Sequence, residues 1–239
     1  MRRVPAAVLA AIAFTGGCSS DSASGARTLT VFAASSLTAV LTAEGRAFET
    51  AHPGLQVRYS FAGSQALVAQ LKQGAPADVL ATADTATMAS SGLADSRVFA
   101  RNRLAIITAP SNPERVTTLS DLGRKGLRIV LAGPSVPVGK AAREALADAG
   151  VTVEPVSLEQ DVKGVVSKVR LGEADAGIAY VTDVKAARGA VAGTELSQIS
   201  NSYAVAVVKD SDAARAFTDF LLSAESRSTL ASFGFLPPS

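Results

Sequence analysis

Val31-Phe32-Ala33-Ala34-Ser35-Ser36-Leu37 is a stretch in which the hydrophobic pattern changes from that of a strand to that of a helix. Val31 and Phe32 suit a buried strand, and Leu37 begins a series of apolar residues at helical spacing. Ser36 is therefore predicted at the N-cap of a helix, directly after the carboxyl end of a strand. In open α/β sheets ligands bind at that end of the strands, and a helix N-terminus offers free N–H groups to an anion.

A second turn repeats this arrangement. Apolar and polar residues alternate over residues 55–61, which predicts a half-buried strand, and the pattern stops at Ala62-Gly63-Ser64-Gln65. A helix is expected from Leu67, so Ser64 takes the same place after its strand as Ser36 does. Both serines could still be ordinary helix caps.

The second half of the chain holds two more predicted helix starts. The rigid turn Gly133-Pro134-Ser135-Val136-Pro137-Val138-Gly139 leads into a helix over residues 140–149, and Asp161 is predicted to cap the helix that begins at Val162. Val138 could simply pack in the core. Together, however, the four turns can place four helix N-termini around one site, each with roughly half a positive charge. Such a site can hold a dianion without a Lys or Arg in contact.

Strands and helices alternate along the chain, which predicts an α/β fold with mainly parallel sheets flanked by helices. We expect residues 29–109 and 203–239 in lobe 1, and residues 110–202 in a second lobe inserted in the first. The two crossovers are expected at residues 110–113 and just before Ser202. Two connections between lobes form a hinge, with a cleft between them.

The composition excludes several classes of protein. The chain has 239 residues, and without Arg2 and Arg3 its basic and acidic residues are equal in number at 21 each. There is no basic stripe that would suit nucleic acid. Only 5% of the residues are aromatic and none is Trp, which argues against sugar sites and single-stranded nucleic-acid platforms. Any anion site must therefore be local.

The N-terminus has the pattern of a secretory signal. Two arginines precede an apolar segment over residues 4–14 that is too short to span a membrane, and Cys18 follows it. Residues 1–18 resemble a lipoprotein signal peptide that ends at a lipobox Cys, although Thr15 departs from the usual aliphatic residue. Residues 19–28 are rich in Ser, Gly and Ala and are expected to form a flexible tether. The protein is therefore expected to be exported and anchored by a lipid on Cys18 to the outer face of the cell membrane.

An enzyme is the main rival class, and the sequence argues against it. The only His, His52, lies in a His-Pro-Gly turn, and no Gly-x-Ser-x-Gly motif is present. The segment from Gly133 to Lys140 differs from a phosphate loop because five residues separate its glycines and Ala141 replaces the required Ser or Thr. No cluster of His and Cys suggests a metal site. We expect no cofactor.

Six short motifs of the chain resemble those of a known family. The chain resembles the periplasmic molybdate-binding proteins of ABC importers, a group of bacterial extracellular solute-binding proteins, from about residue 29 to residue 237. The motifs, in the order and roughly the spacing of that family, are Val31-Phe32-Ala33-Ala34-Ser35-Ser36-Leu37, Phe61-Ala62-Gly63-Ser64, Gly74-Ala75-Pro76-Ala77-Asp78, Val136-Pro137-Val138-Gly139, Asp161-Val162-Lys163-Gly164 and Gly177-Ile178-Ala179-Tyr180. The resemblance implies the two-lobed type II periplasmic-binding-protein fold, with the ligand in a cleft between the lobes.

The resemblance also implies which residues hold the ligand. Two serine hydroxyls, two backbone N–H groups and one tyrosine hydroxyl bind the oxyanion in that family, and by motif these correspond to Ser36, Ser64, Val138, Val162 and Tyr180. The molybdenum would be bound only as its oxyanion, with no direct protein ligand. Three neighbours are candidates for a supporting role, namely Ser35, Gly63 and Asp161.

The implied ligand is molybdate, with tungstate as its chemical equivalent. Both ions are fully ionised at neutral pH and offer only acceptors, which suits a site made of donors. Sulfate shares this property, so a receptor for sulfate, phosphate or another anion on the same fold remains an alternative, as does a surface adhesin. The implied partners are an ABC permease and the membrane through the lipid anchor; the protein is expected to act as a monomer.

Overall fold

The structure is a computed structural model that describes residues 27–238, except for the side chains of Gln198 and Ile199. The predicted signal peptide, Cys18 and residues 19–26 of the predicted tether lie outside the described residues. Residues 27 and 28, which we expected in the tether, already belong to the first strand. The strand starts earlier because Arg27 donates its N–H to Gly54 O and pairs with the second strand.

Strands and helices alternate as expected. The strands are β1 (Arg27–Ala34), β2 (Leu55–Ala62), β3 (Val79–Thr82), β4 (Arg97–Thr108), β5 (Ile129–Ala132), β6 (Ser157–Glu159), β7 (Ala176–Tyr180) and β8 (Ala192–Val207). The helices are α1 (Thr38–Ala51), α2 (Ser64–Lys72), α3 (Thr85–Ser90), α4 (Pro137–Asp148), α5 (Val162–Arg170), α6 (Val181–Ala186), α7 (Asp212–Leu221) and α8 (Ala224–Phe233). Short 3₁₀ turns, η1 (Ser35–Leu37) and η2 (Ser120–Gly123), precede α1 and β5.

The strands form one mixed sheet in the order β2-β1-β3-β8-β4-β7-β5-β6. The pairs at both ends of the sheet are parallel, as predicted. The three central pairs, which involve β4 and β8, are antiparallel. The expectation of mainly parallel sheets therefore fails in the middle of the molecule, because two long strands run through it in opposite directions.

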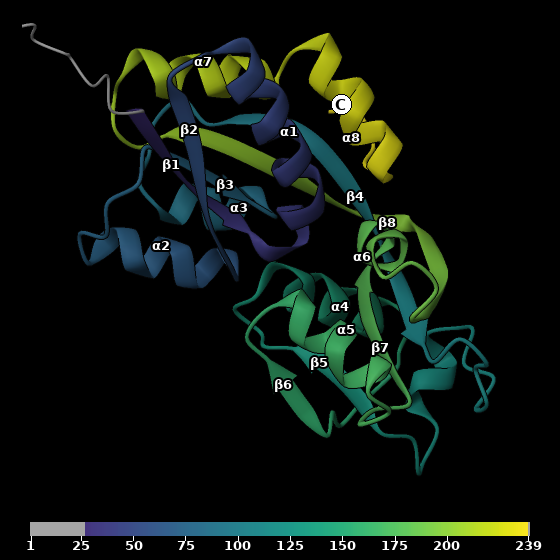
Figure 1. Cartoon of the computed structure of the whole chain (residues 1–239). Coiled ribbons are helices and arrows are strands. Elements are labelled where there is room, and N and C mark those ends of the chain that lie inside the picture. Colours follow the sequence, from purple (N-terminus) through teal and green to yellow (C-terminus); the bar gives the residue numbers. More distant parts are fainter. Residues whose placement is uncertain (1–26, 239) are drawn as a thin grey trace, which may run out of the picture.

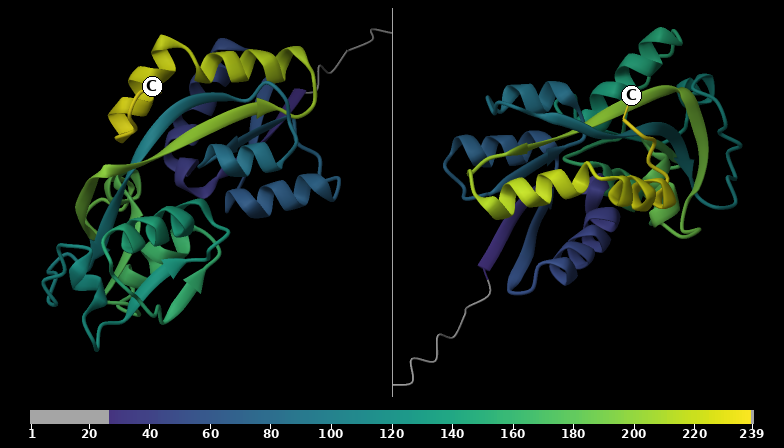
Figure 2. Two further views of the ribbon diagram at one scale, coloured as in Figure 1. Left: turned by 180° about the vertical axis from the view of Figure 1, so that it is seen from behind. Right: turned by 90° about the horizontal axis from the view of Figure 1, so that it is seen from above.

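Figure 1 shows two groups of elements at opposite ends of β4 and β8. We call the group with β1–β3, α1–α3, α7 and α8 lobe 1, and the group with β5–β7, α4 and α5 lobe 2. The view from behind in Figure 2 shows β4 and β8 running side by side from one lobe to the other. Helix α6 lies near this junction and contacts β4, β8 and α8.

In lobe 1 the central strands are buried on both faces. Val31 packs with the large core cluster under α1 and α7, whereas Phe32 packs with Leu67 and Met88 on the side of α2 and α3. Because neighbouring side chains of a strand point to opposite faces, this continuous apolar sequence is what a doubly covered strand requires. The residues that follow the carboxyl ends of these strands lie against residues of lobe 2.

The crossover between the lobes lies inside β4. We expected it at residues 110–113, but Leu104 to Thr108 pair with β7 and therefore belong with lobe 2. The pairing of β4 with β8 changes register after Arg103, which pairs with Ser200, because Leu104 then pairs with Leu196. The expected boundary at 202/203 is also moved, since β8 crosses as one continuous strand that begins at Ala192. The division into two lobes at those residue numbers stays a prediction.

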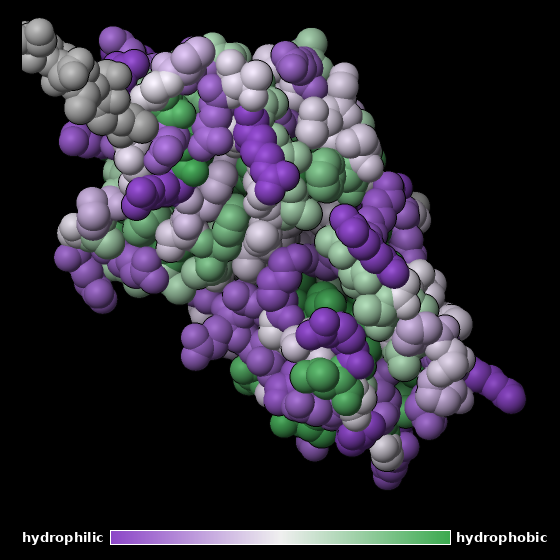
Figure 3. Space-filling model, viewed as in Figure 1, coloured by the Kyte–Doolittle hydropathy of each residue, from purple (hydrophilic) through white to green (hydrophobic). Residues whose placement is uncertain are grey.

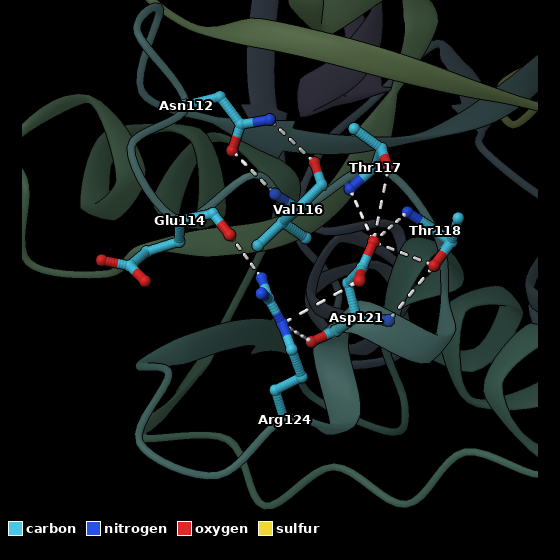
Figure 4. A network of polar contacts seen from close by, with 7 residues as sticks. All are labelled: Asn112, Glu114, Val116, Thr117, Thr118, Asp121 and Arg124. Carbon is cyan, nitrogen blue, oxygen red and sulfur yellow. Dashed lines mark hydrogen bonds and ion pairs between the residues drawn. The ribbon is translucent and has the colours of Figure 1, made fainter.

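The segment after β4 is instead a closed loop within lobe 2 (Figure 4). Asn112 exchanges two hydrogen bonds with the backbone of Val116, at 3.0 and 2.9 Å. Asp121 accepts the backbone N–H groups of Thr117 and Thr118 at 2.9 and 2.8 Å. These hydrogen bonds lower the pKa of the Asp121 carboxyl to about 2. The prolines that suggested a crossover thus belong to a locally bonded turn.

The surface of lobe 2 carries the large exposed apolar side chains of the described residues. Val156, Leu158 and Leu171 are 58%, 51% and 62% exposed, and Figure 3 shows hydrophobic colour over the region of β6 and α5. Val156 directly precedes the edge strand β6, and Leu158 lies within it. None of the helices in the described part of the chain has the length and apolar character needed to span a bilayer.

Candidate functional site

A small cavity lies between the lobes, at the carboxyl ends of the strands. Its walls come from the residues that follow β1, β2 and β3 in lobe 1, and β5, β6 and β7 on the other side. All five residues predicted to bind the ligand line it, together with the three predicted supporting residues Ser35, Gly63 and Asp161. The cavity has a volume of about 10 Å³. That is far below the roughly 300–1,000 Å³ of pockets for drug-sized molecules, so the site is too small for an organic ligand of that size.

Ser36 reaches the cavity from η1 and is buried. We expected Ser36 at an N-cap, and this prediction is wrong. The chain enters α1 through a 3₁₀ turn in which no side chain caps the helix. The Ser36 hydroxyl instead accepts a hydrogen bond from the hydroxyl of Tyr203, at 2.9 Å. Its own proton is therefore left for another acceptor.

Ser64 occupies the first turn of α2, where Gly63 is the N-cap residue. The expected capping role is again absent, and the Ser64 Oγ accepts the backbone N–H of Ala83 at 3.0 Å. Because Ala83 follows β3, this bond fixes Ser64 to the end of a neighbouring strand. The hydroxyl keeps its proton free to donate, as that of Ser36 does.

Tyr180 ends β7 and is only 1% exposed. Its hydroxyl accepts a hydrogen bond from Asn201 Nδ2 at 2.7 Å. Burial raises the pKa of this phenol well above its ordinary value, so the group stays protonated. The structure thus brings three neutral O–H groups, from Ser36, Ser64 and Tyr180, to one cavity.

Lobe 2 contributes the N-termini of two helices. Helix α4 begins at Pro137, earlier than the predicted residue 140, so Val138 lies in its first turn. A Cβ atom on Gly139 would lie 2.1 Å from Gly133 O and 2.4 Å from Ala132 O. Only glycine therefore allows the start of α4 to lie this close to the end of β5.

Val162 is the first residue of α5, and Asp161 is its N-cap, as predicted. Asp161 Oδ1 accepts the N–H of Gly164 at 3.0 Å, which engages this carboxylate within its own turn. The N–H groups in the first turn of a helix have no acceptor within the helix. Val138 and Val162 thus present unpaired N–H groups near the cavity, on helices whose dipoles favour an anion.

The cavity contains no cationic side chain among its described lining residues. The nearest candidate on α5, Lys163, forms an ion pair with Asp183 at 3.0 Å. Asp183 is buried at the start of α6, where it also accepts the N–H of Tyr180 at 3.3 Å. Burial raises the pKa of the Asp183 carboxyl, and the pairing with Lys163 opposes that shift. Lys163 therefore neutralises Asp183. The described lining of the cavity offers an anion only neutral donors and helix N-termini.

The two lobes are in direct contact beside the cavity. Gln65 Nε2 on α2 donates to the carbonyl oxygen of Gln160, which precedes α5, at 2.9 Å. A Cβ atom on Gly63 would lie 2.5 Å from the same carbonyl oxygen. The absence of a side chain at Gly63 thus allows the lobes to meet.

Residues 27–238 contain no group of three or more His, Cys, Asp or Glu side chains that could hold a metal ion. The donor set around the cavity matches an anion, since hydroxyl and N–H groups offer protons and no lone-pair cluster suited to a cation.

The sequence analysis missed the residues behind the hydroxyl groups. Tyr203, Asn102 and Asn201 lie on β4 and β8 and are buried. One signal was available, because asparagine is uncommon in strands and both asparagines stand just before segments that pattern as strands. Their contacts with Ser36 and Tyr180 could not be inferred from spacing.

Comparison with known proteins identifies the family. Residues 29–236 match the family described as bacterial extracellular solute-binding protein. The chain is also 40% identical over 225 residues to the molybdate-binding protein ModA of Mycobacterium tuberculosis, which covers 90% of this chain and 86% of that protein. This chain belongs to the bacterial extracellular solute-binding protein family. Membership confirms the prediction of a binding protein rather than an enzyme.

Other solute-binding proteins show how widely this fold is shared. YvgL of Bacillus subtilis, whose name assigns it provisionally to the substrate-binding lipoproteins of ABC transporters, is 28% identical over 96% of this chain and 95% of its own. The solved structure of the sulfate-binding protein SubI from Mycobacterium tuberculosis has a TM-score of 0.77 at 20% identity, covering 88% of this chain and 87% of its own. The periplasmic molybdate-binding protein of Azotobacter vinelandii has a TM-score of 0.72 at 18% identity, covering 88% and 100%. At these identities the two solved structures show a shared α/β fold and not the ligand.

Proposed function

We propose that this solute-binding protein captures molybdate, and tungstate with it, in the cavity between the lobes and delivers it to an ABC permease. The observation that carries the proposal is the donor set: three buried hydroxyls and two first-turn N–H groups surround a cavity that has no cationic side chain among its described lining. The relative of 40% identity is a molybdate-binding protein. We assign the contacts to Ser36, Ser64 and Tyr180 through their hydroxyls and to Val138 and Val162 through their N–H groups.

The chemistry of the ligand explains why donors suffice. A dianion stripped of its water loses a large hydration energy unless each oxygen finds hydrogen bonds. Hydroxyl and N–H groups that are already held in place supply them without reorganisation, and the helix dipoles of α4 and α5 add positive potential. Asp161, the one carboxylate among the described lining residues, accepts the N–H of Gly164 through Oδ1 as the cap of its own helix.

Sulfate is the second candidate, because the sulfate-binding protein SubI superposes well on this fold. Sulfate also carries no proton at neutral pH, but it is smaller than molybdate. Titration calorimetry with molybdate, tungstate, sulfate and phosphate separates the candidates. We expect tight binding of molybdate and tungstate and much weaker binding of the other two. Tight binding of sulfate without binding of molybdate would overturn the proposal.

We further propose that the lobes close on the ligand about the β4 and β8 crossover. Donors come from both lobes, and Gln65 already bonds to Gln160 across the gap, so full coordination requires the lobes to meet. Small-angle scattering with and without molybdate tests this. We expect the ligand-free protein to sample more extended shapes and molybdate to compact it, and an unchanged radius of gyration would contradict closure.

The lipid anchor and the export of the chain are proposals from residues 1–18, which lie outside the described residues. The named role of YvgL as a lipoprotein gives them distant support. Labelling with radioactive palmitate in a bacterial host should mark the wild type and not Cys18→Ala. Label on Cys18→Ala, or none on the wild type, would remove the anchor from the proposal.

A further inference from the structure

The sheet opens beside the cavity, at the end of β5. This strand pairs with β6 as far as Ala132, but its pairing with β7 ends at Val130. Gly133 donates its N–H to Glu159 O at 2.8 Å, on the side of β6. Because successive residues of a strand direct their backbone groups to opposite sides, the carbonyl oxygen of Ala132 points to the side where β7 no longer pairs. Helix α4 packs there, against both β5 and β7.

Arg143 on α4 supplies the hydrogen bonds at this opening. Its Nη1 donates to the carbonyl oxygen of Ala132 at 3.0 Å and to that of Gly139 at 2.8 Å. Ala132 is the last residue of β5, and Gly139 lies in the first turn of α4. One nitrogen of the guanidinium therefore ties the end of the strand to the start of the helix, at the close approach that the missing side chain of Gly139 allows.

The charge of Arg143 is not matched by a carboxylate. Arg143 is half-buried, and it takes part in none of the ion pairs of the described residues. The other cations on α4 and α5 are either exposed, as Lys140 is, or ion-paired, as Lys163 is. A guanidinium stays protonated in a protein, and hydrogen bonds to carbonyl oxygens leave its net charge unchanged. A full positive charge therefore lies at the junction of β5 and α4.

This charge lies behind the wall of the cavity. Val138 lines the cavity, and Arg143 bonds to the carbonyl oxygen of the next residue, Gly139, although Arg143 itself is not among the lining residues. Salt and water screen a half-buried charge less than an exposed one.

We propose that Arg143 is a positioning residue of the anion site, which fixes the first turn of α4 to β5 and supplies from behind the wall the positive charge that the lining lacks. The inference rests on the proposed function, because it concerns the ligand of the same cavity. The charge acts on the ligand without contact, so the donors of the lining remain the groups that bind its oxygens.

Titration calorimetry on Arg143→Gln tests this role, because the amide keeps a hydrogen-bond donor and removes the charge. Perrhenate is the second probe, since it is a tetrahedral oxyanion of similar size to molybdate with one negative charge instead of two. Coulomb energy is proportional to the charge of the ligand, so we expect the affinity to fall about 10-fold for molybdate and about 3-fold for perrhenate. Arg143→Lys keeps the charge and should lose no more than about 3-fold for molybdate.

Lys140→Gln is the matched control. It removes the same charge from the same helix, but Lys140 is exposed, so the affinity for molybdate should stay within about 2-fold of the wild type. A merely structural role of Arg143 would weaken both anions by the same factor, and Arg143→Lys would then restore nothing. Circular dichroism checks the folding of each variant. Arg143→Met, which keeps the apolar stem, takes the place of Arg143→Gln if the latter does not fold.

The outcomes separate the inference from the proposed function. If the wild type binds molybdate and Arg143→Gln binds it equally well, or if Arg143→Lys loses as much affinity as Arg143→Gln, the inference is overturned while the proposed function stands. Equal losses for molybdate and perrhenate, or a variant set in which neither neutral substitution folds, overturn it as well. If perrhenate does not bind the wild type, the comparison of Arg143→Gln with Arg143→Lys and Lys140→Gln decides. If the wild type binds none of the oxyanions, the proposed function fails and the inference with it.

Discussion

The two halves of the cavity reach the same chemistry by different means. Lobe 1 offers the side-chain hydroxyls of Ser36 and Ser64, and each is held by a donor from another part of the chain, as Ser36 is by Tyr203. Lobe 2 offers, besides the hydroxyl of Tyr180, the main-chain N–H groups of Val138 and Val162, and these depend only on where a helix begins. A hydroxyl must be both present and oriented, whereas an N–H group is oriented by the helix itself. We therefore expect lobe 1 to be sensitive to side-chain identity, and lobe 2 to be sensitive to backbone position.

The largest effect on the affinity for molybdate should come from Gly139→Ala, which displaces the main-chain N–H groups at the start of α4. Its Cβ would lie 2.1 Å from Gly133 O, so the start of α4 must move away from β5. We expect an affinity loss of about 100-fold or more, equivalent to about 3 kcal/mol, measured by calorimetry with molybdate. Gly133→Ala is the control, since its Cβ would have no neighbour closer than 3.7 Å. Equal affinities in the two variants would show that the position of α4 does not matter.

Ser36→Ala and Ser64→Ala remove the two side-chain hydroxyls of lobe 1. Each removes a hydrogen bond to a charged ligand, worth about 1–3 kcal/mol of binding energy, or roughly 5–150-fold in affinity. Each also leaves a buried donor without its acceptor, Tyr203 in one case and the N–H of Ala83 in the other. Titration calorimetry with molybdate measures the affinity, and thermal unfolding measures the stability. Full affinity in both variants would place the ligand elsewhere.

The sequence predicted the positions of these residues better than their roles. The change from strand to helix pattern located Ser36 and Ser64 correctly at the carboxyl ends of β1 and β2. It suggested N-caps because serine after a strand commonly caps a helix. The observed bonds come from Tyr203 on β8 and from Ala83 just after β3, and local spacing carries no information about them.

The same limit applies to the fold. Alternating strands and helices predicted an α/β architecture, and Asp161 was identified correctly as a cap because its bond to Gly164 is local. The crossover was misplaced because the apolar run from Leu104 to Thr108 reads the same whether its partner is in lobe 1 or lobe 2. Only the pairing with β7 decides that, and pairing is a long-range property.

A pH effect should distinguish the lobes as well, because lobe 1 buries a carboxyl group without a cation. Glu44 on α1 accepts a hydrogen bond from Ser226 at 2.7 Å, and burial raises its pKa to about 7. The buried Asp183 on α6, by contrast, is paired with Lys163 of lobe 2. A raised pKa means that the folded state binds the proton more tightly, so stability from Glu44 is present below pH 4.5 and lost as the pH rises through about 7.

Glu44→Gln removes this loss, because the amide stays neutral and can still accept from Ser226. We expect the free energy of unfolding of the variant, minus that of the wild type, to be about 1–2 kcal/mol larger at pH 8 than at pH 5. Urea unfolding at both pH values measures it. Glu225→Gln, at an exposed neighbouring position on α8, is the control. Its free energy of unfolding, minus that of the wild type, should differ between the two pH values by less than about 0.5 kcal/mol. A constant difference between Glu44→Gln and the wild type would refute the raised pKa.

The smallest effect on binding should come from Val138→Ala. Val138 is 1% exposed and belongs to the main hydrophobic core, so the loss of two methyl groups should cost about 1–3 kcal/mol of stability. Its N–H group is unchanged, and α4 still begins at Pro137, so the affinity for molybdate should change by less than about 2-fold. Ser36→Ala should lower both affinity and stability, whereas Val138→Ala should lower stability alone. If Val138→Ala weakens binding as much as Ser36→Ala does, the side chain of Val138 contributes to the site, and the distinction between a side-chain half and a main-chain half does not hold.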